Sequence, residues 1–524
     1  MSEPADVVTA VVNAEVVIVG YGPVGNALAI LLAQLGRSVS VLERWPQPYP
    51  LPRAVHFDHE VGRILQACGL GAELEAITEP AEVYEWRNAA GATLLRFGRV
   101  GMGASAWPQS SMFNQPALEA LLDQRAQALT GIEVRRGVEV VGIAQDDDGV
   151  TVHGRSTDGV AVEARAKYVV GCDGANSTVR SLIGAPVRDL GFFYDWLIVD
   201  VVLDEPRVFD PINLQICNPA RPATAVSGGP GRRRWEFMRL PHESPDELND
   251  EAAAWRLLAP WDVTPGNATL ERHAVYTFQA RWAEQWRAGR VLLAGDAAHQ
   301  MPPFAGQGLG AGLRDVTNLA WKLDLVLDGR APAALLDTYM TERVPQVRSV
   351  IDLSMELGKI ICVPDPDEAA ARDEAMCAGV VEGQLAEVPD LPGIADGCCH
   401  FGSPHAGALF VQGVVHDGAR RARFDEVVGA GWRLVSRADA AIELDDDLAA
   451  WFAGLGGQCV SVGARGDLED VDGTYAAWFA VHDAVAVLQR PDFYVYGTAR
   501  TGAEVKDLFL HLAAVTAGMP MSTS

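Results

Sequence analysis

The chain has 524 residues, of which 49% are hydrophobic and 21% charged, as expected for an ordinary globular protein of two or three domains. Its formal net charge of −27 argues against nucleic acid and anionic membranes as partners, because both require basic surface. The 8 cysteines show no CxxC pair and no metal-ligand spacing, and the N-terminus lacks the basic region of a signal peptide. We therefore expect a cytoplasmic protein without a metal.

The first motif runs from residue 15 to residue 44 and combines a strand, a glycine turn, a helix and a second strand. The turn reads GYGPVG (residues 20–25), and the second strand ends on Glu43. In such a turn the glycines permit a tight bend, close approach of a pyrophosphate and packing of helix on strand. The pyrophosphate then lies at the helix N-terminus, where free N–H groups favour negative charge. The acid after the second strand can accept hydrogen bonds from ribose hydroxyls.

A membrane helix is the alternative for this segment, because residues 16–36 carry no charge over a length that could span a bilayer. Glycines and Pro23 break its first half, however, and Asn26 and Gln34 make its second half more polar. The order of strand, turn, helix, strand and acid therefore favours a dinucleotide site. The motif alone does not separate FAD from NAD.

Polar residues that could face a bound dinucleotide follow this motif. A proline-rich loop leads to Arg53 and His56, and a helix is expected from about residue 59 to 68. Arg53 could contact a phosphate or a flavin edge, or it could lie on the surface. Pro116 opens an amphipathic helix and leaves Gln115 at its N-terminal end.

Two further loops resemble nucleotide-binding loops. Residues 132–170 predict a β-meander, and its last strand ends in CDGANSTVR (residues 172–180), which turns at once into a helix start. Near residue 290 another buried strand ends in GDAAH (295–299), and PPFAGQGLG (302–310) opens a long helix. Such glycine density suits backbone N–H groups that press against a flat or anionic ligand.

Residues 195–280 are rich in strand signals and are expected to form a separate sheet. On the strand from residue 234 to 240, Trp235 and Phe237 share one face, which we place in the core. The alternating positions and two residues of neighbouring strands are expected to line a cavity: Arg234, Glu236, Met238, Gln215 and Val226. A solvated strand position is the alternative for Glu236. Beyond about residue 390 the composition changes, and residues 407–512 predict a further α/β unit.

The three loops together, with Glu43, resemble those of the single-component FAD-dependent aromatic hydroxylases, the family of para-hydroxybenzoate hydroxylase. The chain looks closest to the (3-hydroxyphenyl)propionate hydroxylase and polyketide hydroxylase branch. The resemblance implies an α/β fold with a Rossmann-like FAD-binding domain of the glutathione-reductase type, over residues 1–75, 108–185 and 283–390. A mixed-sheet substrate domain (76–107 and 186–282) is interleaved with it, and a thioredoxin-like C-terminal domain without CxxC follows (391–524).

The resemblance also implies which residues hold non-covalent FAD. Asp296 would bind the ribityl chain, Pro303 would lie near the reactive edge of the flavin, and the N–H groups of Leu309 and Gly310 would face the flavin carbonyl that becomes negative on reduction. The expected cofactor residues are Gly20, Gly22, Val24, Gly25, Glu43, Arg44, Arg53, Gln115, Val140, Asp173, Asp296, Pro303, Gly306, Gly308, Leu309 and Gly310.

The implied reaction is hydroxylation of a phenol with NADH or NADPH and O₂ through a flavin hydroperoxide, after the phenol has lost its proton. Residues expected to line the substrate site or to act as the base are Pro303, Gln215, Glu236, Met238 and His56, with Tyr194 as a further candidate base. Gly228 and Gly229 stand where simple hydroxybenzoate enzymes place an arginine, which favours a larger or more neutral phenol. The exact phenol, the choice between NADH and NADPH, the base and a homodimer stay open.

Two other functions fit the same pattern. An FAD-dependent epoxidase or reductase of the same fold could act on a polyketide or quinone-like substrate, and oxygen consumption with a ring-hydroxylated product would distinguish the hydroxylase. A flavin-binding protein without turnover is the second alternative. The PPFAGQGLG loop argues against it, because binding alone does not require such an approach to the reactive edge of the flavin.

Overall fold

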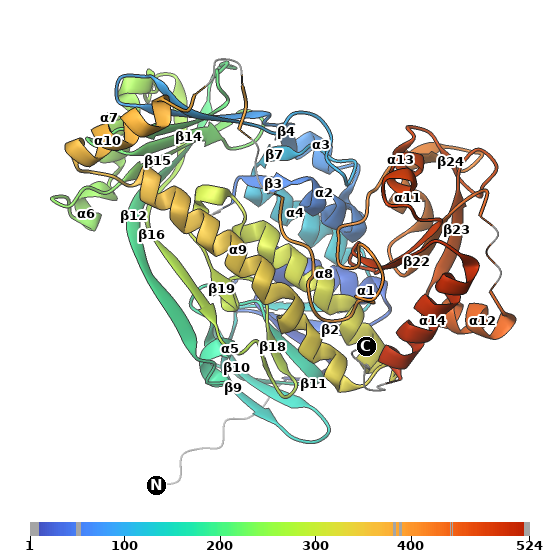
Figure 1. The fold of residues 1–524 in the computed structure, drawn as a ribbon. Coiled ribbons are helices and arrows are strands. Elements are labelled where there is room, and N and C mark those ends of the chain that lie inside the picture. Colours follow the sequence, from blue (N-terminus) through green and yellow to red (C-terminus); the bar gives the residue numbers. More distant parts are fainter. Residues whose placement is uncertain are drawn as a thin grey trace, which may run out of the picture.

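The computed structural model describes residues 10–48, 54–380, 384–386, 390–440, 442 and 444–517. Two eight-stranded sheets and two long helices make up the larger part, and a smaller unit from the last fifth of the chain packs beside them (Figure 1). Within the described part of the chain, no helix combines the length and the apolar character that a bilayer-spanning segment needs.

The first sheet is parallel at its centre, where β1 lies between β11 and β2. The second half of β1, residues 16–19, is buried on both faces, which explains its continuous apolar run. α1 (Pro23–Gln34) follows the glycine turn and packs against α8 (Gly308–Leu327). The strands of this sheet are β1 (Ala10–Val19), β2 (Val39–Glu43), β8 (Ile132–Arg136), β9 (Val138–Gln145), β10 (Val150–Ser156), β11 (Ala161–Gly171), β17 (Arg287–Ala288) and β18 (Val291–Leu293).

The second sheet has the order β19-β16-β12-β15-β14-β13-β5-β6, so the expected separate sheet is present. It also includes two strands from residues 83–98 and the two-residue strand β19, which follows the GDAA turn. Its strands are β5 (Val83–Asn88), β6 (Thr93–Gly98), β12 (Val187–Leu203), β13 (Asn213–Cys217), β14 (Ala223–Ser227), β15 (Arg232–Met238), β16 (Ala268–Ala283) and β19 (His299–Gln300).

The two faces of the second sheet differ in the way that the alternation on β15 predicts. Trp235 and Phe237 are buried in a core with Leu197 and Val199, and α6 (Pro245–Leu248) and α7 (Glu251–Leu258) contribute to that core. The opposite face turns toward the first sheet. A small sheet of β3 (His56–Asp58), β7 (Ser110–Phe113) and β4 (Thr78–Pro80) lies in the same part of the molecule as α2 (His59–Leu65) and α4 (Gln115–Gln127) (Figure 1).

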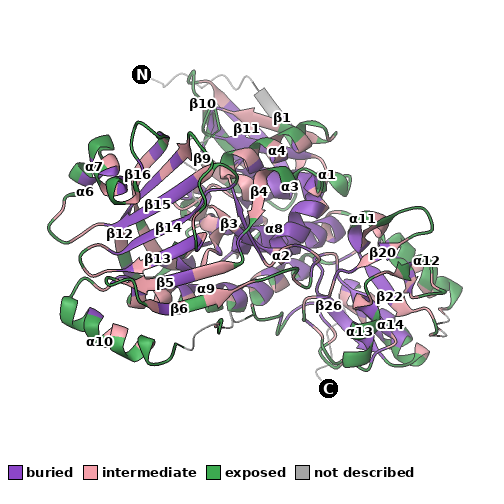
Figure 2. Cartoon of the chain, turned by 90° about the horizontal axis from the view of Figure 1, so that it is seen from above, coloured by how far each residue is buried: buried purple, intermediate pink, exposed green. Residues whose placement is uncertain are grey.

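The central helix α8 is buried along nearly its whole length, and α9 (Asp337–Ile361) packs alongside it (Figure 2). The remaining helices before the C-terminal unit are short or lie at the surface, as α10 does in Figure 2. These are α3 (Leu74–Ile77), α5 (Thr178–Leu182) and α10 (Pro366–Cys377).

The C-terminal unit has a four-stranded sheet in the order β23-β22-β25-β26 and a three-stranded sheet in the order β21-β20-β24. Trp321 and Leu325 of α8 join its core, so it is not packed as a separate body. The thioredoxin-like assignment and the domain bounds stay predictions. Its elements are β20 (Val414–His416), β21 (Arg421–Arg423), α11 (Phe424–Val428), β22 (Arg433–Arg437), α12 (Asp446–Gly454), β23 (Gln458–Val462), β24 (Glu469–Asp470), α13 (Thr474–Val481), β25 (Ala486–Gln489), β26 (Val495–Ala499) and α14 (Gly502–Thr516).

A buried ion-pair network joins this unit to the helices. Glu342 of α9 accepts a hydrogen bond from Arg490 at 2.6 Å and forms an ion pair with Lys322 of α8 at 2.8 Å. All three side chains are fully buried. Burial of the carboxyl opposes its ionisation, but the charges of Arg490 and Lys322 outweigh burial and lower the pKa of Glu342.

We expect Glu342→Ala to destabilise the protein by about 3–5 kcal/mol, because it leaves two buried cations without this shared carboxylate. Urea unfolding of the purified variant measures the change. Glu356→Ala on the same helix is the matched control, since that exposed carboxylate forms a surface pair with Lys359 and should contribute less than about 1 kcal/mol. Equal unfolding curves for Glu342→Ala and wild type would show that the network does not hold the units together.

Candidate active site

A cavity of about 1050 Å³ lies where the glycine loops of the first sheet meet the inner face of the second sheet. Residues from distant parts of the chain form its wall, among them Val24, Gln115, Asp296 and Tyr494. Pro303 and the first residues of α8 form another side. The predicted cofactor loops and the predicted substrate strands thus border one space.

The glycine turn after β1 has the geometry that a bound pyrophosphate requires. Gly20 has a φ of +99°, and a Cβ atom there would lie 2.5 Å from the carbonyl oxygen of Cys172. A Cβ at Gly25 would lie 2.1 Å from the carbonyl oxygen of Gly20, so this glycine packs helix on turn. A Cβ at Gly22, by contrast, would meet no atom within 4 Å. Gly22 therefore leaves open space at the N-terminus of α1, and it borders the cavity.

Half of the predicted cofactor residues line the cavity: Gly22, Val24, Gln115, Asp296, Pro303, Gly306, Gly308 and Leu309. Gly20 and Gly25 are buried behind the turn, and Gly310 is buried one residue inside the lining part of α8. Val140 is buried on β9 and also lies outside the lining. Arg44 is exposed and stacks over Trp45. Arg53 falls outside the described residues.

Two predicted acidic residues shape their loops through backbone hydrogen bonds. The carboxylate of Glu43 accepts the N–H groups of Tyr21 and Trp45 at 2.7 and 2.8 Å, so it ties the glycine turn to the end of β2. Asp173 accepts the Ser177 hydroxyl at 2.5 Å and the Val179 N–H at 3.1 Å, next to the start of α5. Its neighbours Cys172 and Gly174 line the cavity, whereas Asp173 itself does not.

The N-terminal turn of α8 is held by a buried arginine that sequence reasoning missed. Arg314 donates to Asp58 at 2.7 and 2.8 Å and to Glu60 at 2.6 Å, and it also contacts the amide oxygen of Gln307 at 3.2 Å. Burial opposes ionisation of Asp58, but the charge of Arg314 outweighs it and lowers the pKa of that carboxyl. The first N–H groups of α8 have no acceptor within the helix, so this turn can donate to a ligand.

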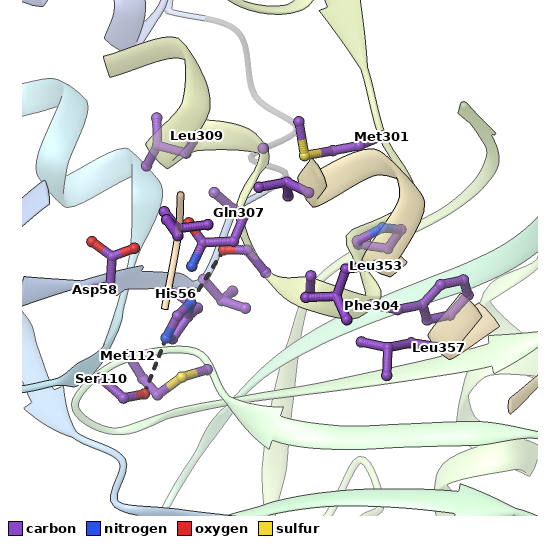
Figure 3. A pocket seen from close by; sticks show the side chains of 18 of the residues that line it. His56, Asp58, Ser110, Met112, Met301, Phe304, Gln307, Leu309, Leu353 and Leu357 are labelled. Carbon is purple, nitrogen blue, oxygen red and sulfur yellow. Dashed lines mark hydrogen bonds between the residues drawn. The ribbon is translucent and has the colours of Figure 1, made fainter. Parts of the chain in front are cut away.

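His56 connects the α8 loop to the second wall of the site (Figure 3). Its Nδ1 lies 3.1 Å from the carbonyl oxygen of Gly306, and its Nε2 lies 3.0 Å from the hydroxyl of Ser110. Because a carbonyl can only accept, Nδ1 carries the proton in the neutral ring, and Nε2 accepts from the Ser110 hydroxyl. Burial and the nearby charge of Arg99 lower the pKa of His56 to about 4, so the ring is neutral near pH 7.

The inner face of the second sheet presents a polar row to the cavity. Gln215 pairs with Thr224, and Thr224 pairs with Glu236, so the three side chains lie side by side on neighbouring strands. Gln215 accepts the hydroxyls of Tyr84 and Thr224 at 3.0 and 2.8 Å and donates to the Ala223 carbonyl, which makes it a fixed part of the wall. All of these polar side chains line the cavity.

Glu236 differs from the rest of this row. Among the described residues, its closest cation is Arg234 at 3.8 Å, and no hydrogen bond to its carboxyl group is found within the described part. Burial raises the pKa of Glu236, and the charge of Arg234 only partly offsets it. Arg234 is itself bound to Asp200 at 2.7 and 3.0 Å, and Arg272 reaches the same carboxylate at 2.9 Å. The alternative of a solvated Glu236 is wrong, because the residue is 8% exposed.

Two predicted substrate residues do not line the cavity. Met238 is on the same face as Glu236 but is buried beside Trp196, with which it pairs across the sheet. The large indole closes the sheet face at that point, so the cavity ends before Met238. Tyr194 packs against Phe192 and also lies outside the lining. Val226 lines the cavity as expected.

The residues that line this space fit a flavin dinucleotide. Gly22 leaves the room that a pyrophosphate needs at the N-terminus of α1, and the N-terminal turn of α8 supplies further N–H donors. The site residues missed from sequence are Ser110, Tyr84, Arg99, Arg272 and Arg314. Each of these residues reaches the site only because segments far apart in the chain come together in the fold. In the sequence alone, a single basic or hydroxyl residue is too common to be recognised as a site residue.

Comparisons with known proteins agree with this geometry. A family model described as "FAD binding domain" matches residues 13–354, and one described as "HcaD C-terminal domain" matches residues 407–514. The chain is 40% identical to a probable NADH-specific resorcinol 4-hydroxylase of Rhodococcus jostii, over 97% of this chain and 96% of the relative. It is 34% identical to a 3-(3-hydroxy-phenyl)propionate/3-hydroxycinnamic acid hydroxylase of Burkholderia cenocepacia, over 92% and 93%.

A solved structure gives the same result for the fold. The ternary complex of aklavinone-11 hydroxylase with FAD and aklavinone superposes with a TM-score of 0.74 at 26% identity, and it covers 95% of this chain and 99% of that one. The similarity extends over both sheets and the C-terminal unit. The chain therefore belongs to the family of FAD-dependent aromatic hydroxylases, with an FAD binding domain followed by an HcaD C-terminal domain.

Proposed function

We propose that this protein hydroxylates a small phenol, with NADH as the electron donor and O₂ as the second substrate. The single observation that carries the proposal is that one cavity joins the open space at Gly22 and the α8 turn to the polar row on the second sheet. The 40% identical relative is named for resorcinol and NADH, which supports a small phenol and this donor. A homodimer and a cytoplasmic location stay predictions.

Bound FAD supplies the oxygen-activating chemistry, and the chain supplies binding, orientation and proton transfer. Gly22 and the first N–H groups of α1 would hold the pyrophosphate, Glu43 would orient the ribose end, and Asp296 would contact the ribityl chain. The first N–H groups of α8 would stabilise the part of the flavin that becomes negative on reduction. Arg314 keeps that turn in place through Asp58 and Glu60.

His56 and Ser110 assist loss of the phenolic proton. The Ser110 oxygen accepts the hydrogen bond of the phenol while its own hydrogen points to Nε2 of His56, and the proton moves along this path to Nε2. The Gly306 carbonyl holds the opposite nitrogen and fixes the tautomer. Glu236 binds a second polar group of the ring, such as the second hydroxyl of resorcinol, because its carboxyl group is buried at the far wall, lies 3.8 Å from Arg234 and accepts no hydrogen bond from the described residues.

The activity is tested with FAD-loaded protein, NADH and a panel that includes resorcinol. We expect a phenol to stimulate oxidation of NADH and consumption of O₂, with one atom of labelled oxygen in the ring product. A substrate that is turned over equally well without O₂ would favour the reductase alternative. If no phenol stimulates NADH oxidation by flavin-loaded protein, the proposed activity is wrong.

We expect Gly22→Ala to leave the folding of the flavin-free protein unchanged and to weaken FAD binding at least about tenfold, or roughly 1.4 kcal/mol. The backbone of Gly22 (φ −73°, ψ −177°) is accessible to alanine, and the added methyl group would enter only the space assigned to the pyrophosphate. Thermal unfolding and flavin titration measure the two effects. Gly25→Ala is the matched comparison, because its methyl group clashes with the Gly20 carbonyl and should destabilise even the flavin-free protein. Unchanged FAD affinity in Gly22→Ala would place the pyrophosphate elsewhere.

We expect His56→Ala to lower kcat by about 10²–10⁴-fold for a phenol that is neutral at the assay pH, with FAD content unchanged. A phenol that is already ionised needs no base and should lose much less, and a higher assay pH should partly restore the variant. Since the pKa of His56 is about 4, its protonation should not limit the wild type above about pH 6. His153→Ala, at an exposed histidine on β10, is the control. An equal loss for neutral and ionised phenols would contradict a role in deprotonation.

A further inference from the structure

The cavity wall contains a buried amide group that the reaction described above does not use. Gln307 is the residue that immediately precedes α8, it is 5% exposed, and it lines the cavity. Its oxygen is bound to Arg314, but for its Nε2 group no acceptor is found in the part of the chain that the structure describes. Buried polar groups in proteins nearly always have a hydrogen-bond partner. The amide nitrogen is therefore a donor available to a ligand in the cavity.

Arg314 determines which end of this amide is offered to the ligand. Its Nη1 lies 3.2 Å from Oε1 of Gln307. A guanidinium group has only donors, so the atom that faces it must be the amide oxygen, and the NH₂ group lies on the other side. Arg314 cannot easily turn away, because Asp58 and Glu60 bind it at 2.6–2.8 Å. The side chain of Gln307 is thus oriented before any ligand binds.

The first turn of α8 is built to admit this pair of side chains. A Cβ atom at Gly310 would lie 2.7 Å from Nη1 of Arg314 and 3.2 Å from Oε1 of Gln307. A serine, threonine, aspartate or asparagine before a helix usually accepts one of its free N–H groups, whereas the side chain of Gln307 makes no such bond. The Gln307 amide therefore adds a donor to the free N–H groups of the helix and does not occupy any of them.

The preceding residue shows on which side of His56 this donor lies (Figure 3). The Gly306 carbonyl is bound to Nδ1 of His56, whereas Ser110, which receives the phenol in the proposed reaction, is bound to Nε2. Gln307 thus follows the Gly306 side of the ring, together with the first N–H groups of α8. Figure 3 shows its side chain in the same part of the cavity as Leu309. The donor belongs to the α8 turn and not to the path of the phenolic proton.

We propose that Gln307 is a further cofactor-binding residue, whose Nε2 group donates a hydrogen bond to the part of the flavin ring that becomes negative on reduction. This inference rests on the proposed function, because it assumes that FAD occupies the cavity with that part at the α8 turn. A hydrogen bond to a charged acceptor is stronger than one to a neutral acceptor. Gln307 therefore stabilises reduced FAD more than oxidised FAD, and it raises the reduction potential of the bound flavin.

The test is an equilibrium reduction of the FAD-loaded protein against a reference dye, without phenol, NADH or O₂. Gln307→Met keeps the length of the side chain and removes the amide. It should weaken the binding of reduced FAD, relative to oxidised FAD, about tenfold, which lowers the two-electron potential by about 30 mV. Gln307→Glu keeps an oxygen for Arg314 but places a negative group where the donor was, so it should lower the potential further.

Gln109→Glu is the matched control, because Gln109 lines the same cavity but its Nε2 already donates to the Val100 carbonyl at 3.1 Å. It should shift the potential much less than Gln307→Glu does. A wild-type potential in both variants of Gln307, or a raised potential in Gln307→Glu, would overturn the proposal. So would an unchanged potential combined with weaker binding of resorcinol to the oxidised protein, because the amide would then serve the phenol.

The same measurements separate this inference from the proposed function. Wild-type potentials in the variants of Gln307, with a wild type that hydroxylates a phenol, would overturn the role of this residue alone. A wild type that retains no FAD would overturn both. Thermal unfolding of the flavin-free variants at the wild-type temperature excludes misfolding as the cause of a lowered potential.

Discussion

The buried charge of Arg314 is the constraint on which the rest of the site depends. Its guanidinium binds Asp58 at the end of β3 and Glu60 in α2, and Glu60 in turn accepts the hydroxyl of Tyr494 from the C-terminal unit at 2.9 Å. One cation thus joins three segments that are far apart in the chain. A buried charge without such partners would cost several kcal/mol, so the segments cannot separate without a large loss of stability. The same side chain contacts Gln307, and this fixes the turn that opens α8.

Asp315, the next residue of α8, fixes other loops of the site by its own buried contacts. Asp315 binds His299 at 2.6 Å, Arg343 of α9 at 2.9 Å and the N–H of Gly295 at 3.0 Å. Because Arg314 and Asp315 are neighbours on a helix, their side chains point in different directions and hold different loops. The loop with Asp296 and the loop with Pro303 are therefore both fixed to one rigid helix. Donors held in this way need little reorganisation when charge develops in front of them.

Local patterns in the sequence predicted the parts of the site that depend on local structure. The glycine turn after β1 and the two faces of β15 follow from turn chemistry and from a period of two, and the structure has both. Arg272 could not be found in this way, because it reaches the cavity only through the pairing of Asp200 with a strand some 70 residues later. Ser110 likewise depends on its pairing with Asp58. Met238 follows the correct alternation but lies beyond the point at which Trp196 closes the cavity.

The C-terminal unit contributes to the site, although the sequence suggested a separate domain. Tyr494 and Leu409 line the cavity, and Arg63 of α2 binds Asp425 at 2.6 Å from the other side of the contact. Trp321 of α8 packs edge-on against Trp432 within the core of that unit. A unit without a CxxC pair can therefore be retained for a physical reason other than redox chemistry: it closes one wall of the cavity and supplies partners for charges buried beneath α8. Loss of this unit would expose Glu60 and Glu342 to water, and through Arg314 it would release the turn that opens α8.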